Sequence, residues 1–458
     1  MPDRDRERAP GSAVAAAPSL GDVRSIVRLA VPITASRLGG LLLITVDIVM
    51  LGHVDGTALA YYGLANSLVM VPFLIGVGML VGIAVLTAQA RGAGRDIECG
   101  AIWRVGLAHA LLMGAAFSAL SLLGGDLLAL IGQTPALAEG GGRALIALGL
   151  GLPGVLAFVA CTIFLEAVGR PRVGVVVMLA ANVLNLALNA VMIGDGPGLG
   201  GAVGAALATS ICRTLMALAL VVYILRLPEA QLYNLRGPLQ GPWQVSARLR
   251  RLGYGFGVAQ GLESAAFASL SLFAGLLGAA AVASYQIVLN VVAFAFMAAV
   301  GVATATGVGV GHAVGRRDRR ALAQAGWSGV ATITVFMLGV GAIVVLAPEA
   351  IVRLYSADPD LLVMAVPAMV LAGLMLIPDG MQAVLMGALR GAGDVWAPTA
   401  MHLFAFIGVM MPGAWLLAID LDYGLPGLLG AGILGVGTAA LLLGGRFLML
   451  SRRRVVPA

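Results

Sequence analysis

Three carboxylate side chains lie within apolar stretches of the sequence, where a carboxylate is the least expected residue. Asp47 lies within LLLITVDIVML, Glu263 within VAQGLESAAF and Asp379 within LMLIPDGMQAV. If these stretches cross a bilayer, each carboxylate costs about 2.5 to 3.5 kcal/mol on insertion scales, and such residues commonly bind ions or move protons. They are therefore candidate cation or proton sites. The alternative is an interhelical hydrogen bond that only holds the helices together.

Another apolar stretch carries two amide side chains that can act together with Asp47. The segment ANVLNLALNAV places Asn185 and Asn189 four residues apart, which is one face of a helix. Their amide groups can coordinate a cation or hydrogen-bond to Asp47, although paired asparagines also join helices with no other role. Arg37 precedes Asp47 by ten residues. That spacing is about 15 Å of helix rise, so it excludes a direct pair within the helix.

Two prolines interrupt the stretches that carry these carboxylates. Pro32 removes a hydrogen-bond donor that would meet the carbonyl of Arg28, and Pro378 does the same for Leu374 beside Asp379. The freed carbonyls can help to coordinate ions, and a kink at such a site can act in gating. A purely architectural kink explains both prolines equally well.

The composition determines which elements must position these residues. The chain is 60% hydrophobic and only 11% charged, with a mean hydropathy of +1.00, against roughly 25% charged residues in a soluble domain. Its 458 residues have room for twelve crossings of about 20 residues each. The predicted fold is all-α and polytopic, with spans near 24-50, 57-84, 97-123, 141-167, 173-193, 202-226, 250-276, 281-308, 321-346, 360-389, 396-418 and 425-450.

Arginines fall on alternate connections between these spans and predict the topology. One set of connections carries the arginine clusters, among them Arg170 and Arg172, while the other set carries acidic residues and few basic ones. By the positive-inside rule the arginine-rich set is cytoplasmic, with both termini on that side. The net charge of +6 is therefore a topology signal rather than a nucleic-acid one. Residues 1-22 are interpreted as a cytoplasmic tail and 451-458 as a basic one.

The two halves of the chain repeat each other. A shift of 223 positions matches Tyr62 with Tyr285, Gly78 with Gly301 and Gly92 with Gly315 without a gap. Such self-similarity indicates a duplicated unit of six helices, and because both copies start inside, the repeat is parallel. We therefore expect lobes at 23-226 and 249-450, joined by a cytoplasmic linker at 227-248.

Other classes of chemistry lack support in the sequence. Cys99, Cys161 and Cys212 show no CxxC pairing and are interpreted as buried thiols rather than a metal site or disulfides. GLGLPG at 149-154 matches a dinucleotide fingerprint but lies in an apolar span with no strand before it. Because the spans also show no nucleophile with a base and no clustered metal ligands, we predict that the protein is not an enzyme and has no cofactor.

Several motifs in order along nearly the whole chain resemble the multidrug and toxic compound extrusion (MATE) family, in its NorM-like branch. They are LAVPITASRLGGLLLITVDIVMLGHV, TAQARGAG, LNLALN, ASYQIVLNVVAF and GALRGAGD. The resemblance implies two pseudo-symmetric six-helix lobes around a V-shaped cavity. It also implies antiport of amphipathic, often cationic, drugs against Na⁺ or H⁺.

The resemblance also implies roles for particular residues. Glu263 and Asp379 resemble the family's cation site, which is where Na⁺ would bind. The resemblance also gives this chain the family's first-lobe polar cluster, a substrate or proton site, at Asp47, Asn185, Asn189 and, more weakly, Thr209. Where relatives carry a tyrosine four residues before the aspartate, this chain has Met375, which leaves Na⁺ and H⁺ both open as the coupling ion.

The expected function is thus secondary active efflux of small organic cations and amphipathic drugs from a bacterium. We expect a monomer in the inner membrane, in contact with lipid and not with nucleic acid. The alternative is a lipid-linked oligosaccharide flippase of related two-lobe architecture, although its cavity would need more arginine for a diphosphate. A membrane-embedded enzyme is a third, weaker alternative.

Overall fold

The structure is a computed structural model, and it describes residues 23–54, 56–130, 134–193, 200–237, 242–355 and 359–452. Over these residues the regular secondary structure is helical, with no strand. The predicted tail at 1-22 lies outside the described residues, as do residues 453-458 of the predicted tail at 451-458, whereas Ser451 and Arg452 belong to the last helix of the chain. Each of the twelve predicted spans coincides with one helix or with a run of consecutive helical segments.

The described residues in the first half of the chain form eight helices. They are α1 (Val23–Val54), α2 (Gly56–Gly92), α3 (Asp96–Ser121), the short α4 (Gly124–Leu130), α5 (Pro135–Gly149), α6 (Leu152–Ala167), α7 (Arg172–Met192) and α8 (Gly201–Leu225). α5 and α6 together make one crossing, since Pro135–Ala167 is continuous as an apolar span. The break between them falls at Leu150 and Gly151. Pro153 follows in the first turn of α6.

The second half repeats this order. Its helices are α9 (Pro242–Leu276), α10 (Ala279–Gly315), α11 (Arg319–Leu346), the short α12 (Pro348–Arg353), α13 (Pro359–Gly391), α14 (Trp396–Leu403), α15 (Met411–Trp415) and α16 (Gly424–Arg452). Two segments of this half are π-helical: η1 (Phe404–Met410) joins α14 to α15, and η2 (Leu416–Asp420) follows α15. Together the four segments make one crossing. The short helices α4 and α12 occupy matching places in the two halves, as a duplication predicts.

Most of these helices are long and apolar enough to span a membrane. Among the described residues eleven candidate spans meet that description. α9 is 35 residues long but is less apolar, because Gln260, Glu263 and several serines interrupt it. With α9 the count reaches the twelve crossings that the sequence predicts.

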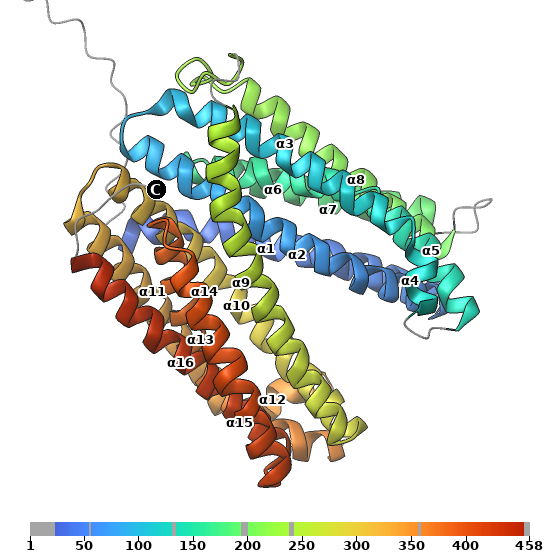
Figure 1. Cartoon of the computed structure of the whole chain (residues 1–458). Helices are drawn as coiled ribbons and strands as arrows, with labels where there is room; N and C mark the ends of the chain where they lie inside the picture. The colour runs from blue at the N-terminus through green and yellow to red at the C-terminus, as the bar shows by residue number, and fades with distance from the viewer. Residues whose placement is uncertain are drawn as a thin grey trace, which may run out of the picture.

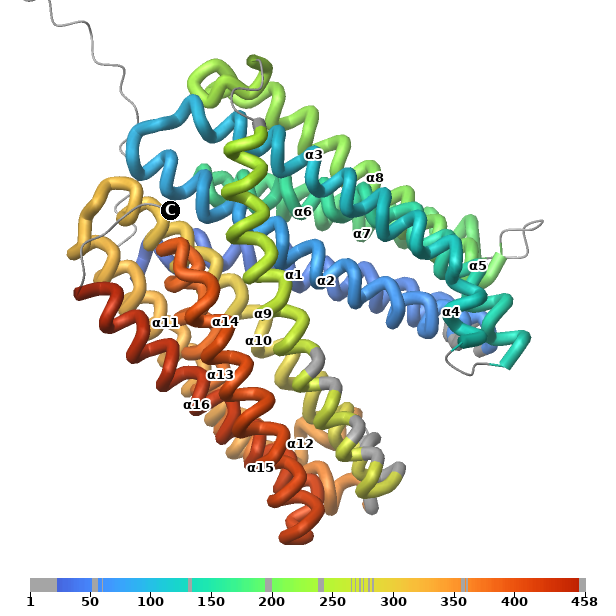
Figure 2. Tube along the Cα trace, in the orientation of Figure 1, coloured from blue at the N-terminus to red at the C-terminus, as the bar shows by residue number. Residues whose placement is uncertain are grey.

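The helices form two lobes that meet at one end of the molecule and diverge toward the other, which gives a V in the ribbon view (Figure 1). α1 to α8 make one arm and α9 to α16 the other, and the tube view traces the same separation (Figure 2). The lobes touch through α1 with α10, α2 with α9 and α2 with α10. The end where they meet carries Arg91 and Arg316, so we call it the arginine-rich end.

At the arginine-rich end the first turns of α1 and α9 are exchanged between the lobes. Ile26, Leu29 and Ile33 of α1 belong to the buried core that the second-lobe helices form. Their counterparts 223 positions later, Leu249, Leu252 and Phe256 of α9, belong to the core of the first lobe. The exchange ties the lobes together, and the shared spacing shows that both halves use the same apolar positions.

Close backbone approaches at the interface follow the same spacing. A Cβ at Gly78 of α2 would lie 2.8 Å from the Cα of Gly257 in α9. A Cβ at Gly301 of α10 would lie 2.0 Å from the hydroxyl of Thr34 in α1. Gly78 and Gly301 are 223 positions apart, as are Thr34 and Gly257. The two contacts are therefore one contact made twice about a pseudo-twofold axis.

Several helices are longer than the sequence predicts. α2 continues to Gly92 and α10 to Gly315, beyond the expected ends at 84 and 308. Polar residues in these extensions, such as Thr87 and Gln89, are buried rather than exposed to water, and Gln89 lies at the lobe interface. α9 begins at Pro242, within the segment interpreted as a linker, and Leu227, Tyr233 and Leu235 before it pack into the first-lobe core.

Candidate functional site

A cluster of polar side chains in the first lobe converges on Asp47, which is fully buried. Its Oδ1 accepts hydrogen bonds from Asn189 Nδ2 at 2.6 Å and Asn185 Nδ2 at 3.1 Å. Its Oδ2 accepts from Tyr62 Oη at 2.5 Å and from the hydroxyl of Thr209. The donors come from α2, α7 and α8, so Asp47 joins four helices at one point.

This arrangement brings together the residues predicted for the first lobe. Asn185 and Asn189 lie on one face of α7, as their spacing predicts, but their nitrogens rather than their oxygens face the carboxylate. An ionised carboxylate accepts about four hydrogen bonds, and Asp47 receives four. In this state Asp47 therefore has no acceptor position left for a ligand.

Two members of the cluster, Tyr62 and Arg213, are absent from the residues that sequence reasoning selects. Tyr62 is a direct partner of Asp47. Arg213 lies on α8 one turn after Thr209, is only 9% exposed, and interacts electrostatically with Tyr62 and Asp47. The signal that marks it is the same as for the carboxylates, a charge inside an apolar span. The sequence gives Asp47 no obvious basic neighbour, and the structure corrects this with Arg213.

A second cluster lies in the other lobe, between α9 and α13. Gln382 donates from one amide nitrogen to both carboxylates, at 3.4 Å to Glu263 Oε1 and 3.2 Å to Asp379 Oδ1. The structure thus brings Glu263 and Asp379 to one point, 116 positions apart in the chain. Gln382 follows Asp379 by three residues on the same helix face, which is a signal available in the sequence.

The second cluster also contains a partly buried cation. Arg390 interacts electrostatically with Glu263, and its guanidinium lies over the ring of Phe256, 5.3 Å from the centroid. His402 of α14 is buried near Arg390, and neither ring nitrogen has a partner among the described residues. The sequence assigns Arg390 to a connection, whereas the helix carries it into the interior. The sequence shows no obvious basic neighbour for Glu263, and the structure supplies one in Arg390.

The oxygens of this cluster suit a small hard cation or a proton. Two carboxylates converge, and Gln382 Oε1 is buried without a partner among the described residues. Carboxylate and amide oxygens are ligands of hard cations. No cluster of three or more His, Cys, Asp or Glu groups that could hold a metal ion is found in the described part of the chain. Any ion bound here would therefore use amide or backbone oxygens as well.

The remaining predicted site residues flank these clusters. Pro378 lies inside α13 directly before Asp379, and Pro32 lies inside α1, well before Asp47. Met375, one turn before Asp379, is buried and contacts Gly432 of α16, so it belongs to the packing of the second lobe. The three cysteines are free and buried, as interpreted.

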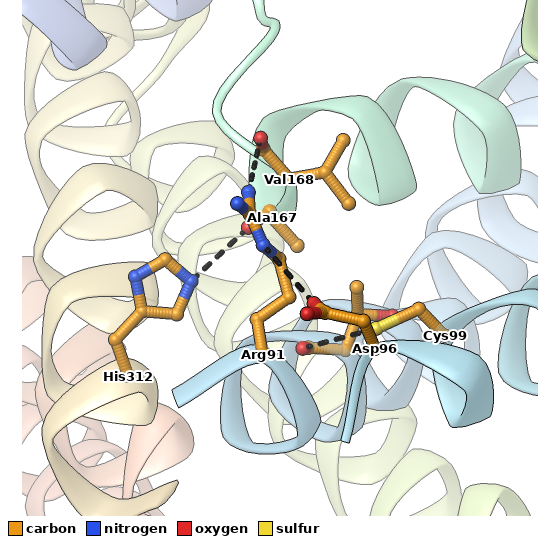
Figure 3. A network of polar contacts seen from close by, with 7 residues as sticks. Arg91, Asp96, Cys99, Ala167, Val168 and His312 are labelled. Carbon is orange, nitrogen blue, oxygen red and sulfur yellow. Dashed lines mark hydrogen bonds and ion pairs between the residues drawn. The ribbon is translucent and has the colours of Figure 1, made fainter. Parts of the chain in front are cut away.

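At the arginine-rich end, a polar network closes the two lobes onto each other (Figure 3). His312 Nε2 of α10 donates to the carbonyl of Ala167 at 3.2 Å, and Gln89 Nε2 of α2 donates to the carbonyl of Gly391 at 3.2 Å. Both bonds cross from one lobe to the other. Arg91 donates to the carbonyl of Val168 at 2.5 Å, which holds the end of α6 in place beside His312.

A partly buried ion pair lies near this network. Arg37 of α1 approaches Glu166 of α6, with Nη2 and Oε1 3.5 Å apart, and Glu166 is only 1% exposed. Arg37 thus finds its partner on another helix, and not Asp47. Glu166 is a fourth intramembrane carboxylate, which the sequence pattern leaves unnoticed because it stands near the end of its span.

Two divergent helical lobes, each with a buried polar cluster, define a class of multi-pass membrane protein rather than a soluble binding fold. The MatE family model matches the chain twice, over residues 32–191 and 256–416, which is one match in each lobe. The chain belongs to this family. The double match confirms the duplication that the repeat spacing predicts.

Individual relatives agree with this membership. The chain is 39% identical to a probable multidrug resistance protein NorM of Caulobacter vibrioides, over 95% of this chain and 93% of that one. It is 32% identical to the protein of the same name from Bradyrhizobium diazoefficiens, over 94% of each. In fold it matches the Vibrio cholerae MATE transporter VcmN in the bent form, with a TM-score of 0.86 at 18% identity, over 95% and 97% of the two chains.

Proposed function

We propose that this chain is a secondary active multidrug efflux transporter that exports amphipathic organic cations in exchange for inward Na⁺ or H⁺. A relative that is 39% identical over nearly the full length carries the name of a probable multidrug resistance protein. The observation that carries the coupling assignment is the pair of carboxylates, Glu263 and Asp379, which share one amide donor inside the second lobe.

The charges of the two clusters support coupling through the second lobe. With both carboxylates ionised and His402 neutral, Glu263, Asp379 and Arg390 sum to a net charge of −1. One monovalent cation or one proton neutralises that charge. In the first lobe Asp47 and Arg213 already balance each other. Because an uncompensated charge in a low-dielectric interior is costly, the second cluster has the stronger tendency to take up a cation.

Antiport follows if occupancy of this site favours one arrangement of the lobes. The ion enters from the divergent side, neutralises the site and shifts the equilibrium toward the arrangement that opens to the cytoplasm, where the ion leaves and the substrate binds. The helix that carries Asp379 also carries Pro378, whose missing hydrogen bond gives α13 a place to bend. The ion changes the free-energy difference between the two arrangements by the difference between its binding free energies to them.

The orientation in the membrane follows from charge. The arginine-rich end faces the cytoplasm of a bacterium and carries both termini, in accordance with the positive-inside rule. The state described here is therefore closed toward the cytoplasm and diverges toward the outside. The protein acts as a monomer in the inner membrane and needs no cofactor besides the coupling ion.

Everted vesicles that contain the protein test the proposal. Efflux substrates such as ethidium are followed by fluorescence under an imposed Na⁺ gradient, a proton gradient, both or neither. We expect Glu263→Gln and Asp379→Asn to abolish ion-driven transport while the protein is still inserted at wild-type levels. Glu139→Gln, at an exposed position in α5, is the matched control, since it removes a carboxylate at the surface.

Two results would contradict the assignment. Transport that continues in both Glu263→Gln and Asp379→Asn would remove the second lobe from coupling. Wild-type vesicles that move no organic cation under either gradient would contradict multidrug antiport itself. A response to only one gradient identifies the ion.

A further inference from the structure

His402, near the end of α14, is a buried imidazole to which the proposed function gives no role. Its side chain is 1% exposed, and both ring nitrogens lack a hydrogen-bond partner among the described residues. The ring packs on Phe406 in the π-helical segment η1, with 5.0 Å between the centroids, and Phe406 packs on Phe267 of α9. Since an unpaired buried polar group is costly, such a side chain indicates a partner that another state of the protein brings to it.

The guanidinium of Arg390 is an unsatisfied donor close to this imidazole. Its Nε is buried without a partner among the described residues, and Arg390 interacts electrostatically with His402. Two contacts bring both side chains to the same turn of α9. The guanidinium lies over the ring of Phe256, 5.3 Å from the centroid, and Thr399, three residues before His402, donates to the carbonyl of Gly255 at 3.3 Å.

The two side chains complement each other chemically. A guanidinium only donates hydrogen bonds, and a neutral imidazole has one nitrogen that accepts them. A protonated His402 would place two cations side by side in the interior, so the neutral form is the one that fits beside Arg390. While Glu263 is ionised, it attracts the guanidinium. An ion that neutralises the carboxylates removes this attraction, and Arg390 then needs a neutral acceptor.

We infer that His402 is a positioning residue of the coupling cycle, whose imidazole accepts a hydrogen bond from Arg390 when an ion neutralises the carboxylates of the second lobe. The inference rests on the proposed function for the coupling ion and its site. Arg390 thus exchanges partners, with Glu263 in the ion-free state and His402 in the occupied state. Because Arg390 directly precedes Gly391, whose carbonyl accepts the bond from Gln89 of the other lobe, this exchange takes place next to the lobe closure.

The two residues should change ion affinity in opposite directions. Loss of the imidazole acceptor destabilises only the occupied state, so it weakens ion binding. Loss of the guanidinium leaves the two carboxylates with a net charge of −2 instead of −1, which destabilises the ion-free state and strengthens ion binding. A purely structural role for the two side chains would not produce shifts of opposite sign.

Ion binding to the purified full chain tests this inference without a gradient. Radioactive Na⁺ is the probe for sodium, and a pH indicator measures proton uptake. His402→Phe keeps an aromatic ring against Phe406 and removes both nitrogens, while His402→Gln keeps an acceptor. Arg390→Met removes the charge, and Arg390→Lys keeps it. His109→Phe, on α3 of the first lobe, is the matched control for a histidine outside the second lobe.

We expect His402→Phe to weaken binding of the coupling ion about tenfold, the usual effect of one hydrogen bond to a charged group, and His402→Gln to keep most of the affinity. Arg390→Met should bind the same ion more tightly, by about tenfold or more, whereas Arg390→Lys should stay near the wild type. Wild-type affinity in His402→Phe, an equal loss in His402→Gln, or weaker ion binding in Arg390→Met would each overturn the inference.

The same proteins in vesicles separate this inference from the proposed function. If the ion affinities shift in opposite directions but the wild type exports no dye, the efflux function is contradicted and the partner exchange of Arg390 stands. If the wild type exports dye and the affinities do not shift in this way, the efflux function stands and the role of His402 is contradicted.

Discussion

Gln89 and His312 stand 223 positions apart and make the same hydrogen bond across the lobe interface, each to a main-chain carbonyl of the opposite lobe at 3.2 Å. The acceptors, Gly391 and Ala167, stand at the ends of α13 and α6, which are equivalent spans of the two lobes. The closure at the arginine-rich end therefore contains two equivalent hydrogen bonds, one from each copy of the duplicated unit. The following predictions begin with these two bonds.

Removing either bond should loosen this closure. We expect Gln89→Leu and His312→Phe each to increase the population with separated arginine-rich ends. A net hydrogen bond is worth about 0.5 to 1.5 kcal/mol, so the increase is about 2- to 12-fold. Spin labels at the exposed positions Ala93 and Arg320, one in each lobe, report the separation. Distance distributions that match the wild type in both variants would show that the bonds do not hold the lobes.

The glycines three residues after these donors should tolerate no side chain. A Cβ at Gly92 would lie 2.1 Å from the carbonyl oxygen of His312, and one at Gly315 would lie 2.1 Å from that of Gln89. Both neighbours are backbone atoms, so the lobes themselves must move. We expect Gly92→Ala and Gly315→Ala to lower dye efflux at least about tenfold, since a shift of about 1.4 kcal/mol in the closure equilibrium suffices. Gly437→Ala in α16, with nothing within 4 Å of its Cβ, should transport normally.

Gln382 should set the ion affinity of the second lobe. Gln382→Leu removes the amide that serves both carboxylates and the one open amide oxygen beside them. We expect the Na⁺ or H⁺ concentration for half-maximal efflux to change by about tenfold, the usual effect of one hydrogen bond to a charged group. Gln231→Leu, on an exposed turn, is the control. An unchanged ion dependence in Gln382→Leu would place the coupling ion elsewhere.

Asp47 should contribute more to stability than to ion coupling. Asp47→Ala leaves four buried donors without their acceptor, at about 1 to 3 kcal/mol for each that stays unsatisfied. We therefore expect a clear fall in Tm in detergent, larger than for Glu263→Gln. Glu139→Ala breaks an exposed pair with Arg143 and should shift Tm little, because such pairs contribute about 0 to 1 kcal/mol. A wild-type Tm in Asp47→Ala would show that the cluster does not hold α1, α2, α7 and α8 together.

The sequence by itself determined the membrane class, the number of crossings and the duplication. These are properties of local hydropathy, charge placement and spacing along the chain, because a segment in lipid must satisfy its own backbone whatever its neighbours are. The same rule marked Asp47, Glu263 and Asp379, since a charge in an apolar span stands out without any tertiary information. The same rule applies to Arg213 and Glu166, because these charged residues lie within the predicted spans 202-226 and 141-167.

Only the tertiary structure decided which of these residues meet. Gln382 lies between Glu263 and Asp379 because the side chains of α9 and α13 reach one point, and Asp47 is saturated because three other helices deliver donors to it. The exchange of α1 and α9 between the lobes and the burial of Gln89 likewise depend on how helices cross. Periodicity gives the face of a helix but not its partner, since lipid and protein interiors are almost equally apolar and the packing choice rests on shape and hydrogen bonds.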